Sequence, residues 1–170
     1  TDAVYIATPH GTHAEYARQA LEAGRHVLVE KPMTLTAGET QELFDLANER
    51  GLVCMEAVKT AFAPGFQRMV AVARSGSIGQ IRSVDATFTK LVSGGREMEG
   101  PDGGSISELA SYPLLAIIKL LGLDFDEVRT ESFKPEGSEV ELFSRIDLHY
   151  PHAVASARTG IGVKAEGDLV

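Results

Sequence analysis

Lys31 lies in the stretch HVLVEKPMTL (residues 26–35), directly after an apolar run and directly before Pro32. A proline disfavours the α-helical conformation for the residue before it, so Pro32 restricts where the Lys31 side chain begins. An ammonium group held at the end of a strand can stabilise negative charge that develops on a reacting oxygen. The alternative is a solvated loop lysine, because most lysines in globular proteins are exposed.

Tyr112 is the second candidate for chemistry, in the stretch SELASYPLL, just before Pro113. A nearby ammonium favours a phenolate, so a tyrosine beside a lysine can accept or donate a proton near neutral pH. A core tyrosine with a satisfied hydroxyl is the alternative reading. Glu108 lies four residues earlier on the same expected helix face, where it either belongs to the site or is the N3 residue of a capping box that begins at Ser105.

His10 and His13 stand three residues apart at the expected start of a helix, a spacing that can suit a metal ion. No acidic or thiol ligand accompanies them at usable spacing, so we expect no metal and assign both to polar ligand contacts or to capping. The single cysteine, Cys54, lies in an apolar run and is expected to be a buried, unreactive thiol. One cysteine excludes an internal disulfide.

Composition and charge narrow the class of protein. The chain has 170 residues, of which 44% are hydrophobic, enough for a buried core, and its formal net charge of −8 argues against nucleic acid as a partner. No apolar run reaches the ~18 residues of a membrane span. These features, with the single cysteine, favour a cytoplasmic globular protein that acts on a small molecule.

The elements that would position these residues alternate in the first part of the chain. Continuous apolar runs predict strands at 3–8, 26–30 and 52–57. Capping-box patterns predict helices that begin at Thr12, with Glu15, and at Thr36, with Glu39. A βαβαβ order with short connections predicts a parallel sheet, half of a doubly wound α/β nucleotide-binding fold. In such sheets ligands bind beyond the carboxyl ends of the strands, and Lys31 would lie there.

The pattern changes after residue 60. A helix is predicted to begin at Pro64, and an alternating strand spans 83–90. The glycine-rich segment 93–104 is expected to be a mobile loop. An apolar helix follows as far as Gly122, started or kinked at Pro113.

Two further segments complete the second part of the chain. Alternating strands at 140–150 and 153–160 would pair as a hairpin. We therefore predict two domains, 1–60 and 61–170, the second an α+β domain with an antiparallel sheet. Its unfinished sheet would present open edges and an apolar face, which favours a homo-oligomer through this sheet.

A dinucleotide site needs a glycine-rich turn between the first strand and helix of its fold, where backbone amides approach the pyrophosphate. The segments GSIGQI (76–81) and GIGVKAEG (160–167) lack the G-x-G-x-x-G spacing, and neither follows a suitable strand. We predict that this chain by itself has no phosphate cradle and does not bind NAD(P) usefully.

The segment AVYIATPHGTHAEYARQALEAGRHVLVEKPMTLTAGE (3–39) resembles the second half of the Rossmann domain of the Gfo/Idh/MocA oxidoreductase family. Its specific signature is the Glu-Lys-Pro tripeptide between strand and helix, preceded by T-P-x-x-x-H. Residues 51–88 extend the match, and GGSISELASYPLLAIIKLLG (103–122) is similar to the helix at the start of the family's second domain. The resemblance covers nearly the whole chain and implies a fragment that lacks the first βαβ units and most of the last strands.

The resemblance also implies roles for particular residues. Lys31 would be the family's catalytic-site lysine, close to the nicotinamide of NAD or NADP and to the reacting hydroxyl. The nicotinamide-ribose side would be lined by Thr8, Pro9, His10, His13, Glu30, Lys31 and Ala57. The family commonly has an aspartate and a histidine where this chain has Glu108 and Tyr112, so a role of Glu108 stays open. Tyrosine there is similar to the dihydrodiol dehydrogenase and glucose-fructose oxidoreductase branches, and MEAVKTAFAP (55–64) leans toward the former.

Two functions follow as expectations. The first is part of an NAD(P)-dependent oxidoreductase that transfers hydride between a nicotinamide and a hydroxyl-bearing carbon of a sugar, polyol or dihydrodiol, with Lys31 and Tyr112 as its catalytic residues and no activity in the isolated chain. The second is a non-catalytic ligand-binding or interaction module that keeps the same scaffold, because a fold does not fix a function.

Overall fold

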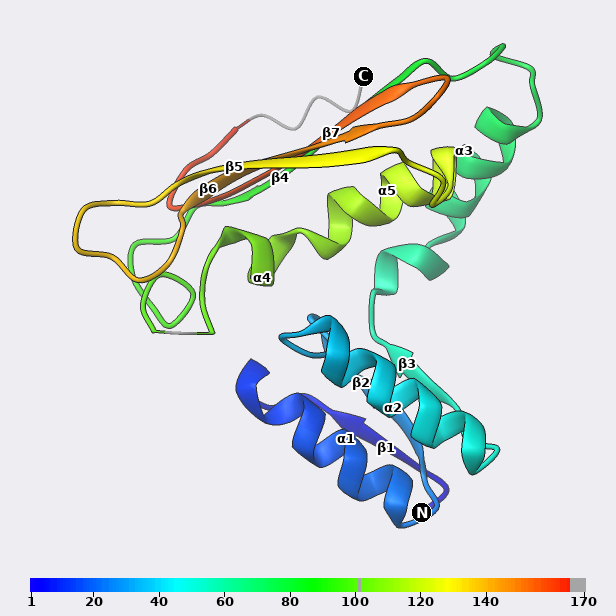
Figure 1. The fold of residues 1–170 in the computed structure, drawn as a ribbon, viewed down its shortest axis with the longest axis vertical. Coiled ribbons are helices and arrows are strands. Elements are labelled where there is room, and N and C mark those ends of the chain that lie inside the picture. The colour runs from blue at the N-terminus through cyan, green and yellow to red at the C-terminus, as the bar shows by residue number, and fades with distance from the viewer. Residues whose placement is uncertain (101, 166–170) are drawn as a thin grey trace. The chain divides into compact units, whose positions relative to one another are not determined.

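The computed structural model describes residues 1–100 and 102–165 (Figure 1). The chain divides into two compact units, unit 1 (Thr1–Val58) and unit 2 (Lys59–Val170). The predicted class is confirmed, since a parallel α/β unit precedes an α+β unit.

Unit 1 is built on three parallel strands in the order β1-β2-β3. The strands are β1 (Ala3–Ile6), β2 (His26–Val29) and β3 (Cys54–Glu56). Helices α1 (His13–Glu22) and α2 (Ala37–Glu49) form the crossovers, and a short 3-10 turn, η1 (His10–Thr12), precedes α1. The predicted βαβαβ order is therefore correct.

The core of unit 1 lies between one face of this sheet and its two helices. Parallel register aligns Ile6 with Val29, and both side chains are buried. Leu21 of α1 and Leu43 of α2 are fully buried against them. Alternate strand residues point to the other face, where Leu28 is 38% exposed.

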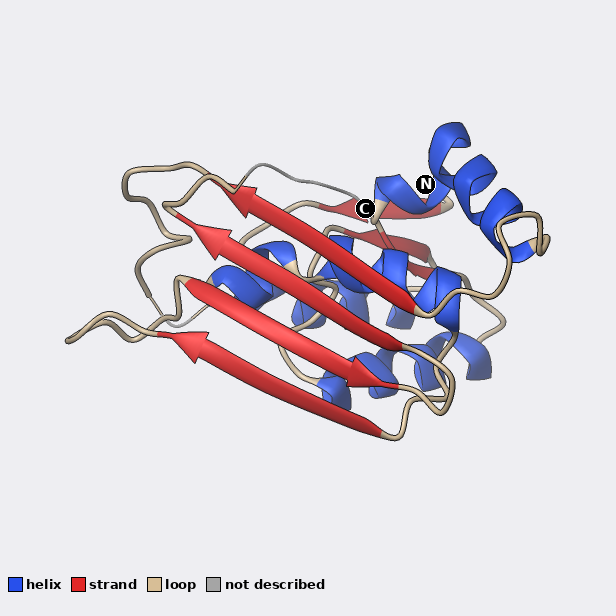
Figure 2. Cartoon of the chain, turned by 90° about the horizontal axis from the view of Figure 1, so that it is seen from above, coloured by secondary structure: helices blue, strands red, loops and turns tan. Residues whose placement is uncertain are grey.

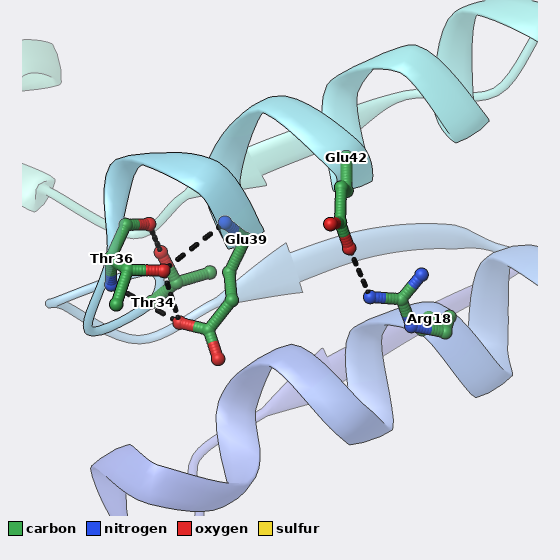
Figure 3. Close-up of polar contacts among 5 residues, drawn as sticks. All are labelled: Arg18, Thr34, Thr36, Glu39 and Glu42. Atoms are coloured by element: carbon green, nitrogen blue, oxygen red, sulfur yellow. Dashed lines mark hydrogen bonds and ion pairs between the residues drawn. The ribbon is translucent and has the colours of Figure 1, made fainter.

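One of the two helix starts predicted in unit 1 has the expected cap. Figure 3 shows the capping box of α2, in which the Thr36 hydroxyl accepts from the backbone N–H of Glu39 and the Glu39 carboxylate accepts from the N–H of Thr36. An ion pair of 2.7 Å between Arg18 and Glu42 links α1 to α2. The capping box predicted at Thr12 is wrong, because its hydroxyl donates backwards to the Pro9 carbonyl instead (2.7 Å).

Unit 2 contains a four-stranded sheet in the order β4-β7-β6-β5 (Figure 2). The strands are β4 (Ser83–Lys90), β5 (Glu127–Phe133), β6 (Phe143–His149) and β7 (Val154–Ile161). The predicted hairpin is confirmed as the antiparallel pair β6–β7. The sheet is mixed rather than antiparallel throughout, because β7 returns beside β4 and runs parallel to it.

The helices of unit 2 cover one face of this sheet. They are α3 (Pro64–Arg74), α4 (Ser105–Leu109) and α5 (Ser111–Leu121), and a 3-10 turn, η2 (Lys59–Phe62), precedes them. Ile117 of α5 and Ala157 of β7 are fully buried in the core between the two layers. The expected start of α3 at Pro64 is confirmed, with the proline in the first turn.

The helical segment 105–121 differs from its prediction in two ways. It breaks at Ala110 rather than at Pro113, which lies in the first turn of α5. The N-cap of α4 is Gly104, and the Ser105 side chain makes no cap. Instead, the carboxylate of Glu141, from the segment before β6, accepts from the backbone N–H of Ile106 at 2.8 Å. A residue distant in the sequence thus satisfies this helix start.

In the glycine-rich segment 93–104, of which Pro101 lies outside the described residues, Glu97 bonds to the end of β4. The Lys90 ammonium donates to the Glu97 carboxylate at 2.7 Å, and this hydrogen bond holds the pKa of Glu97 below its usual value. The backbone N–H of Gly104 donates to the Glu97 carbonyl (2.9 Å). Mobility of this loop stays a prediction.

Candidate functional site

The loops that follow β1 and β2 meet around the His13 side chain. His13 has no exposed surface, and its two ring nitrogens lie 2.8 Å from the Pro32 carbonyl and 2.9 Å from the Thr8 carbonyl. The hydroxyls of Thr12 and Thr8 lie 2.8 Å apart, within hydrogen-bonding distance, which helps to hold the first loop closed. His13 therefore joins the Thr8 loop to the loop that carries Lys31.

Lys31 lies two residues after the end of β2 and is half-buried at the carboxyl end of the parallel sheet. The peptide bond between Lys31 and Pro32 is cis. The backbone N–H of Lys31 donates to the carboxylate of Glu30 at 3.3 Å. The other oxygen of Glu30 accepts from the Tyr5 hydroxyl at 2.5 Å, and this hydrogen bond raises the pKa of Tyr5.

The third strand contributes to the same edge through Glu56, a residue that the sequence analysis did not single out. Its carboxylate accepts from the backbone N–H of Met33 at 3.0 Å. The N–H of Ala57 donates to the Val29 carbonyl (2.7 Å), so the chain beyond β3 stays beside β2. The predicted cofactor-side residues thus gather at one edge of unit 1, where Glu30 and Glu56 fix the backbone on either side of Pro32.

His10 and His13 lie near each other. Their rings meet edge to face with centroids 5.6 Å apart. Within residues 1–100 and 102–165, no group of three or more His, Cys, Asp or Glu side chains could hold a metal ion. The Cys54 thiol is partly buried, and burial raises its pKa, which disfavours the reactive thiolate.

Tyr112 and Glu108 belong to unit 2. The Tyr112 ring is half-buried and lies 4.8 Å, centroid to centroid, from that of Phe88 on β4. Glu108 is only 7% exposed, on α4. Because α4 begins after Gly104, Glu108 is not the N3 residue of a capping box at Ser105, and that alternative reading is wrong.

Tyr112 lines a cavity of about 400 Å³ that lies wholly within unit 2. Its walls come from η2, α3, β4 and α5, and they include Phe66, Met69 and Phe88. Lys59 and Thr60 of η2 also line it. The sequence alone did not indicate this cavity, because its walls come from four separate segments.

Comparison with known proteins places the chain in a family. The model of the GFO_IDH_MocA oxidoreductase family, described as having an NAD-binding Rossmann fold, matches residues 1–58. A reductase of dTDP-3,4-didehydro-2,6-dideoxy-alpha-D-glucose from Streptomyces violaceoruber is 39% identical over 71% of this chain. The chain belongs to the Gfo/Idh/MocA family. A trans-1,2-dihydrobenzene-1,2-diol dehydrogenase from Sus scrofa is 35% identical over 93% of the chain.

Solved structures of the Gfo/Idh/MocA family agree with this fold. A 3-ketoreductase from Actinomadura kijaniata, in complex with NADP and TDP-benzene, matches 98% of this chain with a TM-score of 0.88 and 30% identity. The chain covers 53% of that structure, 36% of the Streptomyces violaceoruber reductase and 48% of the Sus scrofa dehydrogenase. It therefore spans about half or less of the length of these relatives. NAD(P) binding is a property of the family.

In the part of the chain that the structure describes, no helix is both long and apolar enough to cross a bilayer.

Proposed function

We propose that this chain forms the catalytic half of an NAD(P)-dependent oxidoreductase that acts on a hydroxyl-bearing carbon of a sugar, polyol or dihydrodiol. The observation that carries the proposal is the position of Lys31, half-buried at the carboxyl edge of the parallel sheet. Ligands of open α/β sheets bind at this edge. The named activities of the relatives support the substrate classes, since they include a ketosugar reductase and a dihydrodiol dehydrogenase.

The residues of this edge fit one part of a dinucleotide. The backbone loops at Thr8 and Pro32 are closed by His13 and so offer a fixed surface. We propose that the nicotinamide-ribose side would be held by Thr8, Pro9, His10, His13, Glu30, Lys31 and Ala57. His13 would act through the two carbonyls that it joins, because its ring is fully buried. Neither of the two βα connections of unit 1 carries a glycine-rich turn for the pyrophosphate.

Each catalytic side chain has a separate task in this proposal. Tyr112 accepts the proton of the substrate hydroxyl in the oxidative direction and returns it in the reductive direction. Lys31 supplies an ammonium that stabilises negative charge developing on the reacting oxygen. A bound NAD or NADP supplies the hydride acceptor or donor. Solved structures of the Actinomadura kijaniata 3-ketoreductase include a lysine variant and a tyrosine variant, the same two residue types.

The test uses a chimera in which this chain replaces the matching segment of the Streptomyces violaceoruber reductase, assayed with NADP and a panel of sugars, polyols and dihydrodiols. Lys31→Ala should lower kcat by about a hundredfold or more, while cofactor affinity stays within a small factor, because the ammonium acts mainly in the transition state. Lys31→Arg should restore little, since a planar guanidinium does not replace a compact ammonium.

Lys134→Ala is the matched control, because Lys134 is exposed in the segment between β5 and β6. It should leave kcat unchanged. Normal single-turnover rates for Lys31→Ala would refute its catalytic role and favour the non-catalytic module. A folded chimera that binds NADP and turns over no member of the panel would refute the proposed function itself.

We also propose that the protein forms a homo-oligomer through the uncovered face of its second sheet. This face carries exposed apolar side chains, those of Phe133, Phe143 and Val154, but it also carries charges: Arg145 and Asp147 pair there at 2.6 Å, and Arg158 lies 3.6 Å from Asp85. Charges of both signs can pair with those of a second copy. Arg145→Glu should weaken self-association in sedimentation measurements, and the swap Arg145→Glu with Asp147→Arg should restore much of it. An equal mass for all three proteins at every concentration would contradict this assembly.

A further inference from the structure

The cavity beside Tyr112 has walls of an unusual composition for a site that receives a hydroxylated molecule. Three aromatic rings line it, those of Phe66, Phe88 and Tyr112, together with the thioether of Met69. A cavity of about 400 Å³ lies within the range of small-molecule sites. Its walls therefore suit an apolar ring better than a polyhydroxylated one.

A single charged side chain, that of Lys59, accompanies these apolar walls. Lys59 is exposed at the beginning of η2, at the rim of unit 2. Among the described residues, no carboxylate lines the cavity, so a bound anion would meet no repulsive charge from its walls. The electrostatics of the cavity thus favour a negative group on the ligand.

We propose that this cavity binds a ligand with an apolar ring and a carboxylate or another anionic substituent, the ring against Phe66 and Phe88 and the anion paired with Lys59. The inference rests on the proposed function in one respect, namely that this ligand is the substrate whose hydroxyl reacts beside Tyr112. The substrate class narrows accordingly to acidic ring compounds that carry a hydroxyl, such as a carboxylated cyclic diol.

Desolvation explains why such a ligand is preferred over a sugar. A buried hydroxyl needs a hydrogen-bond partner, and the described polar side chains that line the cavity are those of Lys59, Thr60, Thr87 and Tyr112. A sugar would place further hydroxyls against Phe66 and Met69 without partners. A ring with its polar groups at one end places no hydroxyl against Phe66 and Met69, so it loses no hydrogen bonds there. It also gains free energy because its apolar surface is buried.

The test uses the 170-residue chain itself and two probes of similar shape, 2-naphthoate and the neutral 2-naphthalenemethanol. The chain has tyrosines but no tryptophan, so the fluorescence of either probe can be excited at wavelengths beyond tyrosine absorption without emission from the protein. We expect 2-naphthoate to bind about fivefold or more tightly than the alcohol at low ionic strength, with a preference that declines as salt is added.

Lys59→Gln should abolish this preference and leave the binding of the alcohol unchanged. Lys134→Gln removes the same charge from an exposed position that does not line the cavity, so it should keep the preference. Equal binding of the two probes, no binding of either at millimolar concentration, or a preference that survives Lys59→Gln would each overturn the proposal.

The methyl group of Met69 reports where the probe binds. In methyl-labelled protein, with the resonance assigned through Met69→Leu, naphthoate should shift the Met69 signal by its ring current and leave that of Met33, a core residue of unit 1, in place. A shift of Met33 without one of Met69 would locate the site elsewhere and refute the inference. These measurements need neither cofactor nor turnover, so a negative result would not refute the proposed oxidoreductase activity. Conversely, an inactive chimera would not refute the proposed class of ligand for this cavity.

Discussion

The two sheets of this protein differ most in the face that their helices leave uncovered. In unit 1 that face carries Tyr5, Leu28 and Met55, which align across β1, β2 and β3 and are 57%, 38% and 38% exposed. In unit 2 the uncovered face carries the ion pair of Arg145 and Asp147 and its neighbours. Both faces expose apolar side chains, but the second also carries paired charges that would lose water on being covered, so the first gains more free energy from further packing.

This difference separates two kinds of sheet with similar cores. Parallel sheets of α/β proteins are normally covered on both faces, and their strands are apolar on both sides. A sheet of antiparallel or mixed strands with helices on one side alternates apolar and polar residues. The first unit thus keeps a surface suited to further packing, and the second has a surface suited to water or to a polar interface.

Because the two units have separate cores, substitutions in these cores should produce the largest changes in stability. Leu43→Ala in unit 1 and Ile117→Ala in unit 2 each remove a fully buried side chain and should cost about 3 kcal/mol of unfolding free energy. Hydrogen exchange should show that Leu43→Ala accelerates the amides of β1–β3 and leaves those of β5–β7 within about threefold, since local stability follows the core that is damaged. Ile117→Ala should do the reverse. Equal acceleration in both units for either variant would mean that the two cores are energetically one.

The ion pair on the uncovered face of unit 2 should make a smaller, pH-dependent contribution to stability. The hydrogen bonds from Arg145 hold the pKa of Asp147 below its usual value. A lowered folded-state pKa contributes stability above the unfolded value of about 3.9, and that contribution is lost as the pH falls through the folded value. Asp147→Asn should therefore cost about 0.5–1 kcal/mol at pH 7, a modest figure because Arg145 is half-exposed, and progressively less as the pH falls.

Urea unfolding at several pH values measures this difference between Asp147→Asn and the wild-type protein. Asp124→Asn, at an exposed position before β5, is the control and should show no such pH dependence. A cost that is the same at pH 2 and pH 7 would mean that the aspartate acts through packing rather than charge.

A substitution on the uncovered apolar face of unit 1 should produce the smallest change in stability. Leu28→Thr keeps a residue suited to strands and should alter the unfolding free energy by no more than about 0.5 kcal/mol. It should, however, reduce the binding of the apolar dye 1-anilinonaphthalene-8-sulfonate by about a third, since it removes one of the large side chains of this patch. Leu123→Thr is the control, an exposed leucine outside both sheets. Equal dye binding by both variants would show that Tyr5, Leu28 and Met55 do not act as one patch.

The candidate site of unit 1 could be located from the sequence because its determinants are local. Apolar runs of strand length, turn residues after them and the Thr36 capping box place Lys31 at the carboxyl edge of a parallel sheet, as found. The contacts that fix the edge could not be located. His13 joins carbonyls 5 and 19 residues away, and Glu56 reaches an amide 23 residues away, so neither leaves a short-range pattern.

The sequence by itself determined the βαβαβ order, the β6–β7 hairpin and the start of α3, because periodicity and proline position act over a few residues. Tertiary structure decided the rest. It formed β5, whose seven residues are all exposed and carry no burial pattern; it set β4 parallel to β7; and it capped α4 with Glu141. It also brought Lys59 into one cavity with Tyr112. Each of these depends on segments that meet only after the chain has folded, because strand partners, distant caps and cavity walls are chosen by packing and hydrogen bonding across the whole unit.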